Sequence, residues 1–326
     1  MHYLTLPRQL WRFLILGVSA GVLSIALGGC AGAPLASQAS QASQPVRLDN
    51  TSRIAVMSAF SPELDLLLAR LQSPARHELN GVTFTTGTLE GKPAVLFLSG
   101  VSMVNAAMNT QLALDRFNIN AIVFSGIAGG VNPALHIGDV AVPAQWGQYL
   151  EMLMAREPSP GQFAPPPRMT GQLFPNFGMM YPRAVEVHSA AYPARRDKFW
   201  FEVDPAMLAV ARTLGSVPLI NCKAGQCLQR KPELLVGGNG LSGQAFVDNA
   251  AYREYAFKTF QASVLDMETA AVGQVAYSNN VPYIAFRSLS DLAGGGEGEN
   301  EMKTFLSIAA DNSAHVMLAF LAAWKP

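Results

Sequence analysis

Charged residues and cysteine are both scarce in this chain of 326 residues. Charged side chains make up 14% of it, against roughly 25% in typical soluble domains, while 50% of the residues are hydrophobic. So apolar a chain has enough material for a large core and is not mainly disordered. The charges of the 23 basic and 23 acidic residues cancel, so the chain has no net positive charge to attract a nucleic acid and no acidic tail. These absences exclude a nucleic-acid partner and favour a small-molecule site.

Patterns that bind metals are also missing. No His-Glu-x-x-His motif occurs, and the five histidines are scattered along the chain at positions 2, 77, 136, 188 and 315. A structural or catalytic metal requires ligands at short, defined spacings. We therefore expect no metal site.

Much of the apolar excess lies in the first thirty residues. Arg8 and Arg12 precede an uncharged apolar run over residues 13–27, which is shorter than the roughly 20 residues that a membrane-spanning helix needs. The pattern predicts a signal peptide over residues 1–29. Its end, Leu-Gly-Gly followed by Cys30, resembles the bacterial lipobox, although an ordinary signal peptide with an incidental Cys30 is the alternative. The resemblance implies an exported protein whose lipid anchor on Cys30 tethers it to a bacterial membrane, facing the periplasm or the exterior.

The predicted location bears on the chemical state of the other two cysteines. Export would place Cys222 and Cys227 in an oxidising compartment, where they form either a small disulfide loop or two free thiols. The low-complexity segment at residues 30–50, rich in Ser, Gln and Ala, is typical of a tether because it has nothing to bury.

From residue 51 onward, short apolar runs alternate with helical patterns. We expect strands at residues 82–89, 94–99, 121–125, 234–236, 264–266 and 283–287, and helices at residues 103–117, 205–213, 250–260 and 268–277, with a helix start at Ser61-Pro62 and a closing helix near the end of the chain. The alternation predicts one α/β domain over residues 51–326, with a central mixed and twisted sheet flanked by helices. A proline-rich, loop-rich insertion interrupts it at about residues 145–200.

Three expected strand ends carry polar or glycine-rich sequences. They are Ser-Gly-Ile-Ala-Gly-Gly at residues 125–130, Asp-Met-Glu at residues 266–268, and Arg-Ser-Leu-Ser-Asp at residues 287–291. Each has an ordinary structural interpretation when taken singly, such as a tight glycine turn or a favourable acid in a first helical turn. Because ligands of such sheets gather at the carboxyl ends of strands, the three together indicate a binding site.

In this order and at these intervals, the motifs resemble the purine nucleoside phosphorylase and nucleosidase superfamily. The closest branch is that of the methylthioadenosine/adenosylhomocysteine nucleosidases. The resemblance extends from Arg53 to Trp324 and is weakest at residues 145–230. It rests on residues 54–63, 126–130 with the following Gly-Asp-Val, 242–247, Met-Glu-x-Ala-Ala at 267–271, and Arg-x-x-Ser-Asp at 287–291.

The resemblance implies two catalytic carboxyl groups. Asp291 matches the residue that protonates the purine leaving group, which needs a pKa raised by burial. Glu63 matches the carboxylate that activates water on the other side of the scissile bond. We therefore expect hydrolysis of the N-glycosidic bond of purine nucleosides, including 5′-modified ones such as methylthioadenosine, without a cofactor.

The remaining site residues implied by the resemblance bind the substrate. Glu268 would accept hydrogen bonds from the ribose hydroxyls, and Met267 would lie against the sugar. Phe246 and Val247 match the purine-binding segment, Gly129 allows close backbone approach, and Phe60 with Val101 would line a 5′ pocket. In this family a neighbouring subunit often completes that pocket, so a homo-oligomer is expected.

Two departures bear on the reaction. Phosphorylases of this family place a phosphate-binding Arg and a hydroxyl residue where this chain has Phe124 and Ile127, which favours water as the acceptor. The chain also lacks the second Asp that the nucleosidases usually have three residues after Asp291. A phosphate-dependent phosphorylase and a non-catalytic nucleoside-binding or storage protein therefore remain as alternatives.

Overall fold

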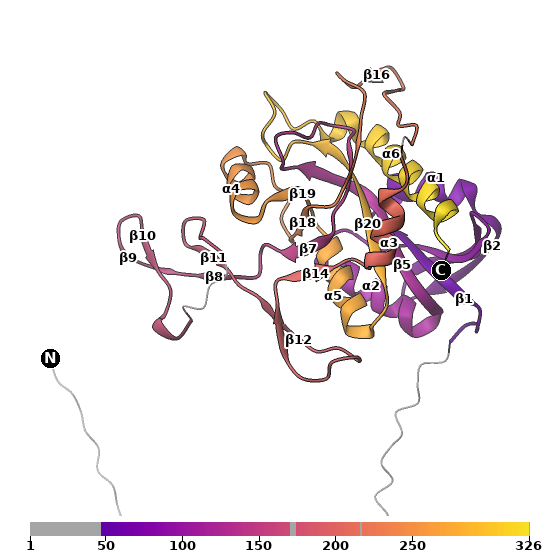
Figure 1. Cartoon of the computed structure of the whole chain (residues 1–326), viewed down its shortest axis with the longest axis horizontal. Helices are drawn as coiled ribbons and strands as arrows, with labels where there is room; N and C mark the ends of the chain where they lie inside the picture. Colours follow the sequence, from indigo (N-terminus) through magenta and orange to yellow (C-terminus); the bar gives the residue numbers. More distant parts are fainter. Residues whose placement is uncertain (1–46, 170–173, 216, 326) are drawn as a thin grey trace, which may run out of the picture. The chain divides into compact units, whose positions relative to one another are not determined.

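A mixed sheet of 12 strands organises the part of the chain that the computed structural model describes, namely residues 47–169, 174–215 and 217–325 (Figure 1). The predicted signal peptide, Cys30 and most of the predicted tether lie outside these residues. Four parallel strands form the centre of the sheet: β1 (Ser52–Ser58), β4 (Lys92–Leu98), β5 (Asn118–Gly130) and β20 (Tyr283–Asp291). β20 is buried at every position, as expected of a strand that is covered on both faces.

Antiparallel strands extend the sheet on one side. They are β3 (Val82–Leu89) and the edge strand β2 (Gln72–Leu79). Beyond β5 on the other side lie β19 (Ala262–Asp266), β18 (Asn239–Ser242), β7 (Gln145–Gln148) and β14 (Trp200–Glu202), while β6 (Val140–Val142) pairs with β20 and with β17 (Leu234–Val236).

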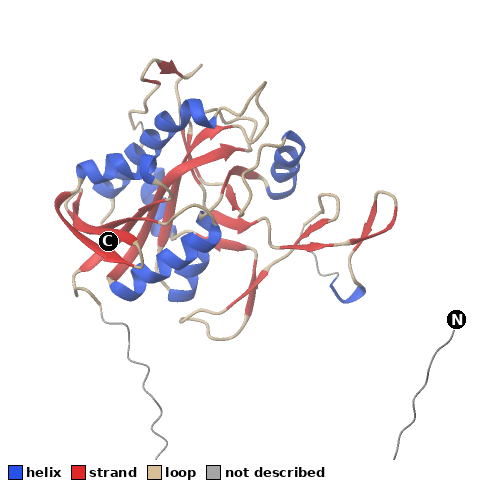
Figure 2. Cartoon of the chain, turned by 180° about the vertical axis from the view of Figure 1, so that it is seen from behind, coloured by secondary structure: helices blue, strands red, loops and turns tan. Residues whose placement is uncertain are grey.

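Helices cover both faces of the sheet (Figure 2). α6 (Met302–Ala323) packs on β20 and β5 and contacts α1 (Ser61–Arg70), and α2 (Met103–Arg116) packs beside α5 (Thr269–Asn279). α3 (Pro205–Arg212) contacts α6, and α4 (Ala250–Phe260) lies beside β19. Among the described residues, α6 alone is long and apolar enough to cross a membrane, but most of it is buried against the sheet, as in a core helix. The expected fold class, a mixed α/β sheet flanked by helices, is confirmed.

Short hairpins fill the proline-rich insertion between β7 and β14. They pair β8 (Met152–Met154) with β11 (Met180–Pro182), β9 (Arg156–Ser159) with β10 (Gln162–Ala164), and β12 (Val185–Val187) with β13 (Arg196–Lys198), and η1 (Pro167–Met169) is a single turn. The hairpins of β8 to β11 extend away from the sheet in Figure 1. A separate hairpin of β15 (Cys222–Lys223) and β16 (Gln226–Cys227) carries a disulfide between Cys222 and Cys227.

The structure corrects three details of the sequence interpretation. The glycine-rich segment 126–130 is not a turn, because β5 continues through it to Gly130. β20 likewise extends to Asp291 instead of ending at Arg287. The strand β2 was not expected because it is mostly exposed and polar, and as an edge strand it needs no apolar alternation.

Candidate active site

A cavity of about 310 Å³ opens at the carboxyl ends of β1, β5, β19 and β20. Its lining is mostly apolar and includes four carboxyl groups, those of Glu63, Asp266, Glu268 and Asp291. The structure brings together here every catalytic and substrate-binding residue that the resemblance implied: Phe60, Glu63, Val101, Gly129, Phe246, Val247, Met267, Glu268 and Asp291. Cys222 and Cys227 are not among the lining residues.

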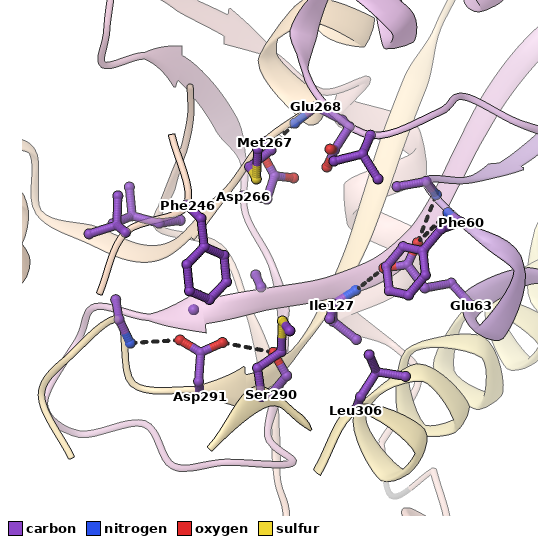
Figure 3. Close-up of a pocket in the computed structure, with 18 of the residues that line it drawn as sticks. Phe60, Glu63, Ile127, Phe246, Asp266, Met267, Glu268, Ser290, Asp291 and Leu306 are labelled. Atoms are coloured by element: carbon purple, nitrogen blue, oxygen red, sulfur yellow. Dashed lines mark hydrogen bonds between the residues drawn. The ribbon is translucent and has the colours of Figure 1, made fainter. Parts of the chain in front are cut away.

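The carboxyl groups are spread around the cavity (Figure 3). Asp291 lies with Phe246 at one end, and Glu63 lies with Phe60 at the other. Glu268 lies beside Met267, on the cavity wall where α5 begins. Asp266 lies beside Met267 as well. A ligand in this cavity therefore has one carboxyl group at each end and two along its side.

Glu63 is fixed by backbone donors at the start of α1. Its Oε2 accepts hydrogen bonds from the N–H groups of Ala59 (2.7 Å) and Phe60 (3.4 Å), and its Oε1 accepts one from Ile127 N–H (2.7 Å). Pro62 at the beginning of the helix has no N–H to satisfy, so the sequence starts the helix at this point. Burial raises the pKa of Glu63, and the charge of Arg287 and the three N–H donors oppose that rise.

Asp291 is the last residue of β20 and is 3% exposed. Oδ1 accepts a hydrogen bond from Ala293 N–H at 2.8 Å, and Oδ2 is 2.9 Å from Ser290 Oγ. Burial raises the pKa of Asp291 above its ordinary value, although these donors oppose the shift. A carboxyl group with a raised pKa holds its proton closer to neutral pH, which is what a general acid requires.

Glu268 occupies the residue position just before α5, and its side chain accepts a backbone hydrogen bond from the loop before α2. Its Oε1 accepts a hydrogen bond from Ser102 N–H at 2.7 Å. Burial, and then the nearby negative charge of Asp266, raise the pKa of Glu268 to about 8, and the guanidinium of Arg287 opposes the rise. Glu268 is thus a buried carboxyl group with acceptor capacity left for a ligand hydroxyl.

Arg287 has no role in the sequence interpretation, although it lies within one of the motifs. It is fully buried in β20, and its Nε forms an ion pair with Asp266 Oδ2 at 2.8 Å. Nη2 donates to Thr269 Oγ1 at 2.8 Å and lies 3.8 Å from Glu268 Oε2. Nη1 is buried and has no hydrogen-bond partner in the described part of the chain. Arg287 is therefore the cation that allows Glu63, Asp266 and Glu268 to share one buried region.

Asp266 is a second residue whose role sequence reasoning missed. Its Oδ1 accepts hydrogen bonds from the Glu268 and Thr269 N–H groups, both at 3.2 Å, and from the Ser242 hydroxyl. These donors belong to β18 and to the start of α5, so Asp266 fixes the turn that presents Met267 and Glu268. The sequence did show an acidic residue two positions before Glu268. The ion pair of Asp266 with Arg287, however, depends on how the strands pack.

Two glycines of β5 make room for site side chains of β20. In the paired strands, Gly126 lies opposite Arg287, and Gly129 lies opposite Asp291. A Cβ at position 126 would lie 1.8 Å from Arg287 Nη1, and one at position 129 would lie 3.1 Å from Asp291 Oδ1. The glycines therefore serve close approach between strands, in place of the turn expected from the sequence.

Comparisons with known proteins agree with this geometry. The sequence profile of the phosphorylase superfamily matches residues 53–322. A 5′-methylthioadenosine/S-adenosylhomocysteine nucleosidase of Lysinibacillus sphaericus is 30% identical over 271 residues, covering 83% of this chain and 99% of the relative. The corresponding protein of Bacillus licheniformis is 29% identical over 269 residues, covering 82% and 98%.

Solved structures show the same fold. A 5′-methylthioadenosine/S-adenosylhomocysteine nucleosidase from S. pneumoniae, solved with a transition-state inhibitor, superposes with a TM-score of 0.63 at 24% identity, covering 84% of this chain and all of that one. The futalosine hydrolase of Helicobacter pylori gives a TM-score of 0.60 at 21% identity, covering 83% of this chain and 97% of that chain. The resemblance seen in the sequence motifs is confirmed, and the chain belongs to the phosphorylase superfamily, with nucleosidases among its relatives.

Proposed function

We propose that this protein hydrolyses the N-glycosidic bond of purine nucleosides, including nucleosides with a modified 5′ group. The observation that carries the proposal is the placement of Asp291 and Glu63 at opposite ends of one cavity, with Glu268 along its side (Figure 3). Such a separation suits an acid and a base that act on opposite faces of a glycosidic bond.

In the proposed reaction, Asp291 gives its proton to a purine nitrogen as the bond between that base and the sugar breaks. The electron pair of the bond leaves with the base, and positive charge develops on the sugar. A water molecule attacks the anomeric carbon and gives a proton to Glu63. The products are a free purine and a free sugar, and no cofactor takes part.

The substrate-binding roles follow from the same arrangement. Phe246 is 53% exposed at the end of the cavity that holds Asp291, so its ring is available to stack on a purine. Glu268 would accept hydrogen bonds from the ribose hydroxyls. Phe60 and Leu306 lie near Glu63 (Figure 3), and Val101 also lines the cavity. This apolar lining suits an uncharged 5′ substituent.

The surroundings of Glu63 support water over phosphate as the acceptor. Phe124 and Ile127 offer no hydrogen-bond donor from their side chains, and the ring of Phe124 packs on the Arg287 guanidinium at 4.0 Å. That guanidinium is fully buried and already paired with carboxylates. The described residues that line the cavity include four carboxyl groups and no Lys or Arg, so a phosphate dianion there would face negative charge without a cation on the cavity wall.

The experiment is an assay of the purified domain with adenosine, inosine and methylthioadenosine, with and without phosphate. We expect free base and free sugar in the absence of phosphate. Strict dependence on phosphate with release of a sugar phosphate would establish a phosphorylase instead. Binding of nucleosides without release of base from any of them would indicate a storage or binding protein.

We also propose that the protein acts as a homo-oligomer through the face of α2. Val101, Val104 and Met108 are exposed at 46%, 57% and 60%, and Val101 also lines the cavity. A second copy on this face would cover these apolar side chains and complete the wall of the cavity. Sedimentation should show an oligomer, and Val104→Asp together with Met108→Asp should yield monomers with reduced activity. A monomeric wild type would overturn this part of the proposal.

The cellular location is proposed from the sequence. We infer export and lipid attachment at Cys30, which would place the enzyme where it meets external purine nucleosides. Expression of the full chain in a bacterium with labelled fatty acid tests this. Label should appear on the wild type and be absent from Cys30→Ala, and equal labelling of both would exclude Cys30 as the site.

A further inference from the structure

Asn300 joins the segment after β20 to the acid and to the purine-binding segment. Its Nδ2 donates to Asp248 Oδ1 at 3.1 Å and lies 3.5 Å from Asp291 Oδ1. Its own carbonyl Oδ1 accepts a hydrogen bond from Met302 N–H at 3.0 Å, at the start of α6. This last bond fixes which end of the amide points to the carboxylates, so the donor orientation follows from the hydrogen-bond network.

The contacts of Asp291 distinguish its two oxygens. Oδ1 faces two N–H donors, the backbone of Ala293 and the amide of Asn300. An oxygen that accepts from two N–H groups is not the protonated one. In the described part of the chain, the hydrogen-bond partner of Oδ2 is the Ser290 hydroxyl at 2.9 Å, and a hydroxyl can rotate either to donate or to accept. The proton of the neutral carboxyl group therefore resides on Oδ2.

The glycines at residues 294–296, before Asn300, have no side chains that could contact Asp291. A Cβ at Gly294 would lie 2.3 Å from Asn249 N, and one at Gly295 would lie 2.4 Å from Arg253 Nη1, so this segment packs with its backbone directly on the start of α4. In the described segment 292–301, Asn300 is the residue whose side chain forms a hydrogen bond to Asp291. Asn300 also connects Asp291 to the purine-binding segment, since its partner Asp248 directly follows Phe246 and Val247.

We propose that Asn300 is a positioning residue for the catalytic acid: it holds Oδ1 of Asp291 as an acceptor, so that Oδ2 delivers the proton to the purine, and it ties segment 292–301 to the purine-binding segment. This inference rests on the proposed hydrolysis. By donating to Oδ1, the amide also stabilises the carboxylate that remains after proton transfer, and it lowers the pKa of Asp291 relative to a site without it.

The test compares the wild type with Asn300→Ala, with Asn300→Gln, which keeps an amide, and with the control Asn176→Ala. Asn176 is exposed, and its amide donates to Gly178 O away from the cavity. Two profiles are recorded against pH: kcat for nucleoside hydrolysis, and the affinity for adenine by calorimetry. Thermal midpoints establish that each variant is folded.

We expect Asn300→Ala to lower kcat about 3- to 10-fold, as for the loss of one hydrogen bond, with a smaller change in KM. The alkaline limbs of both profiles should move to higher pH, because Asp291 loses a donor that favours its ionised form. Asn300→Gln should restore part of both effects, and Asn176→Ala should match the wild type. A merely structural role would lower the thermal midpoint and the amount of active enzyme without moving either limb.

The outcomes separate the inference from the proposed function. If the wild type hydrolyses nucleosides and Asn300→Ala shows unmoved alkaline limbs, the positioning role is wrong and the hydrolase proposal stands. If the wild type releases no base, the hydrolase proposal fails and the catalytic role of Asn300 fails with it. In that case, a shift of the alkaline limb of the adenine-affinity profile in Asn300→Ala relative to the wild type would still show that Asn300 influences the pKa of Asp291.

Discussion

Arg287 on β20 fills the space that a side chain at Gly126 would occupy on the neighbouring strand β5. The two residues are register partners, and Nη1 lies 1.8 Å from the position of a Cβ at residue 126. The same Cβ would lie 2.7 Å from Glu63 Oε1. The absence of a side chain at Gly126 thus allows the buried cation of Arg287 and the carboxyl group of Glu63 to lie side by side, which is why the geometry of the site depends on the pairing of these strands.

Replacement of Gly126 tests this relationship. Gly126→Ala should displace Arg287 and Glu63 together, destabilise the protein by about 1–3 kcal/mol as in other overpacked cores, and abolish most of the activity. Gly129→Ala is the matched comparison, because its nearest contact would be 3.1 Å and requires only a small adjustment of Asp291. Chemical denaturation and kcat measure both effects. Equal stability and activity of Gly126→Ala and the wild type would contradict this close packing of Arg287 and Glu63 against Gly126.

The acid role of Asp291 predicts a large loss without unfolding. Asp291→Asn keeps the shape and the acceptor oxygen but has no acidic proton, so kcat should fall about 10²- to 10⁴-fold. Asp311→Asn is the control, since that carboxylate pairs with Lys223 on the surface of α6. Initial rates with methylthioadenosine and thermal midpoints are measured for both. Full activity of Asp291→Asn would remove Asp291 from the mechanism.

The pH dependence of the rate follows from the two raised pKa values. Glu63 must be ionised to accept a proton from water, so the rate should rise as pH increases through its raised pKa. Asp291 must be protonated, so the rate should fall as pH increases through its own raised pKa. A bell-shaped profile is expected, with both limbs above the pH range of ordinary carboxyl groups. Loss of the acidic limb in Glu63→Gln, together with a much lower rate, would support the assignment, whereas an unchanged acidic limb would refute it.

Glu268 should make the stability of the ligand-free protein depend on pH. Its pKa is raised from 4.5 to about 8 on folding, so the folded state binds the proton more tightly than the unfolded state does. The stabilising effect of the proton is complete below the unfolded pKa and is lost as pH rises from about 4.5 to about 8. Thermal midpoints at pH 5 and pH 8 should therefore differ less in Glu268→Gln than in the wild type. The same difference in both proteins would mean that another group causes it.

The disulfide should affect stability modestly and activity very little. It closes a loop with a sequence separation of 5, and the chain-entropy relation gives about 2 kcal/mol for so short a loop. Cys222→Ser with Cys227→Ser should lower the free energy of unfolding by no more than about that amount, and kcat should not change because neither residue lines the cavity. Denaturation curves with and without reductant provide the measurement. A large loss of activity in the double variant would contradict this prediction and would show that the hairpin affects the geometry of the site.

The strongest sequence signals were those with a local cause. Ser61-Pro62 marked the beginning of α1 because a proline in the first turn needs no N–H partner, and the apolar residues at 283–287 marked a strand buried on both faces. The polar edge strand β2 has no such local signal, since its position depends only on pairing with β3.

The sequence by itself determined the α/β class and the order of the motifs, because periodicity and strand ends are properties of neighbouring residues. The resemblance of these motifs to a known family implied three of the four carboxyl groups that line the cavity, those of Glu63, Glu268 and Asp291, but gave no role to Asp266. Tertiary structure alone decided that the glycines at 126 and 129 lie within a strand, opposite Arg287 and Asp291. It also decided that Arg287 balances three buried carboxyl groups and that Asn300 reaches the acid. These relationships join residues far apart in the chain, and their energies depend on burial and on distances that exist only after the strands have paired.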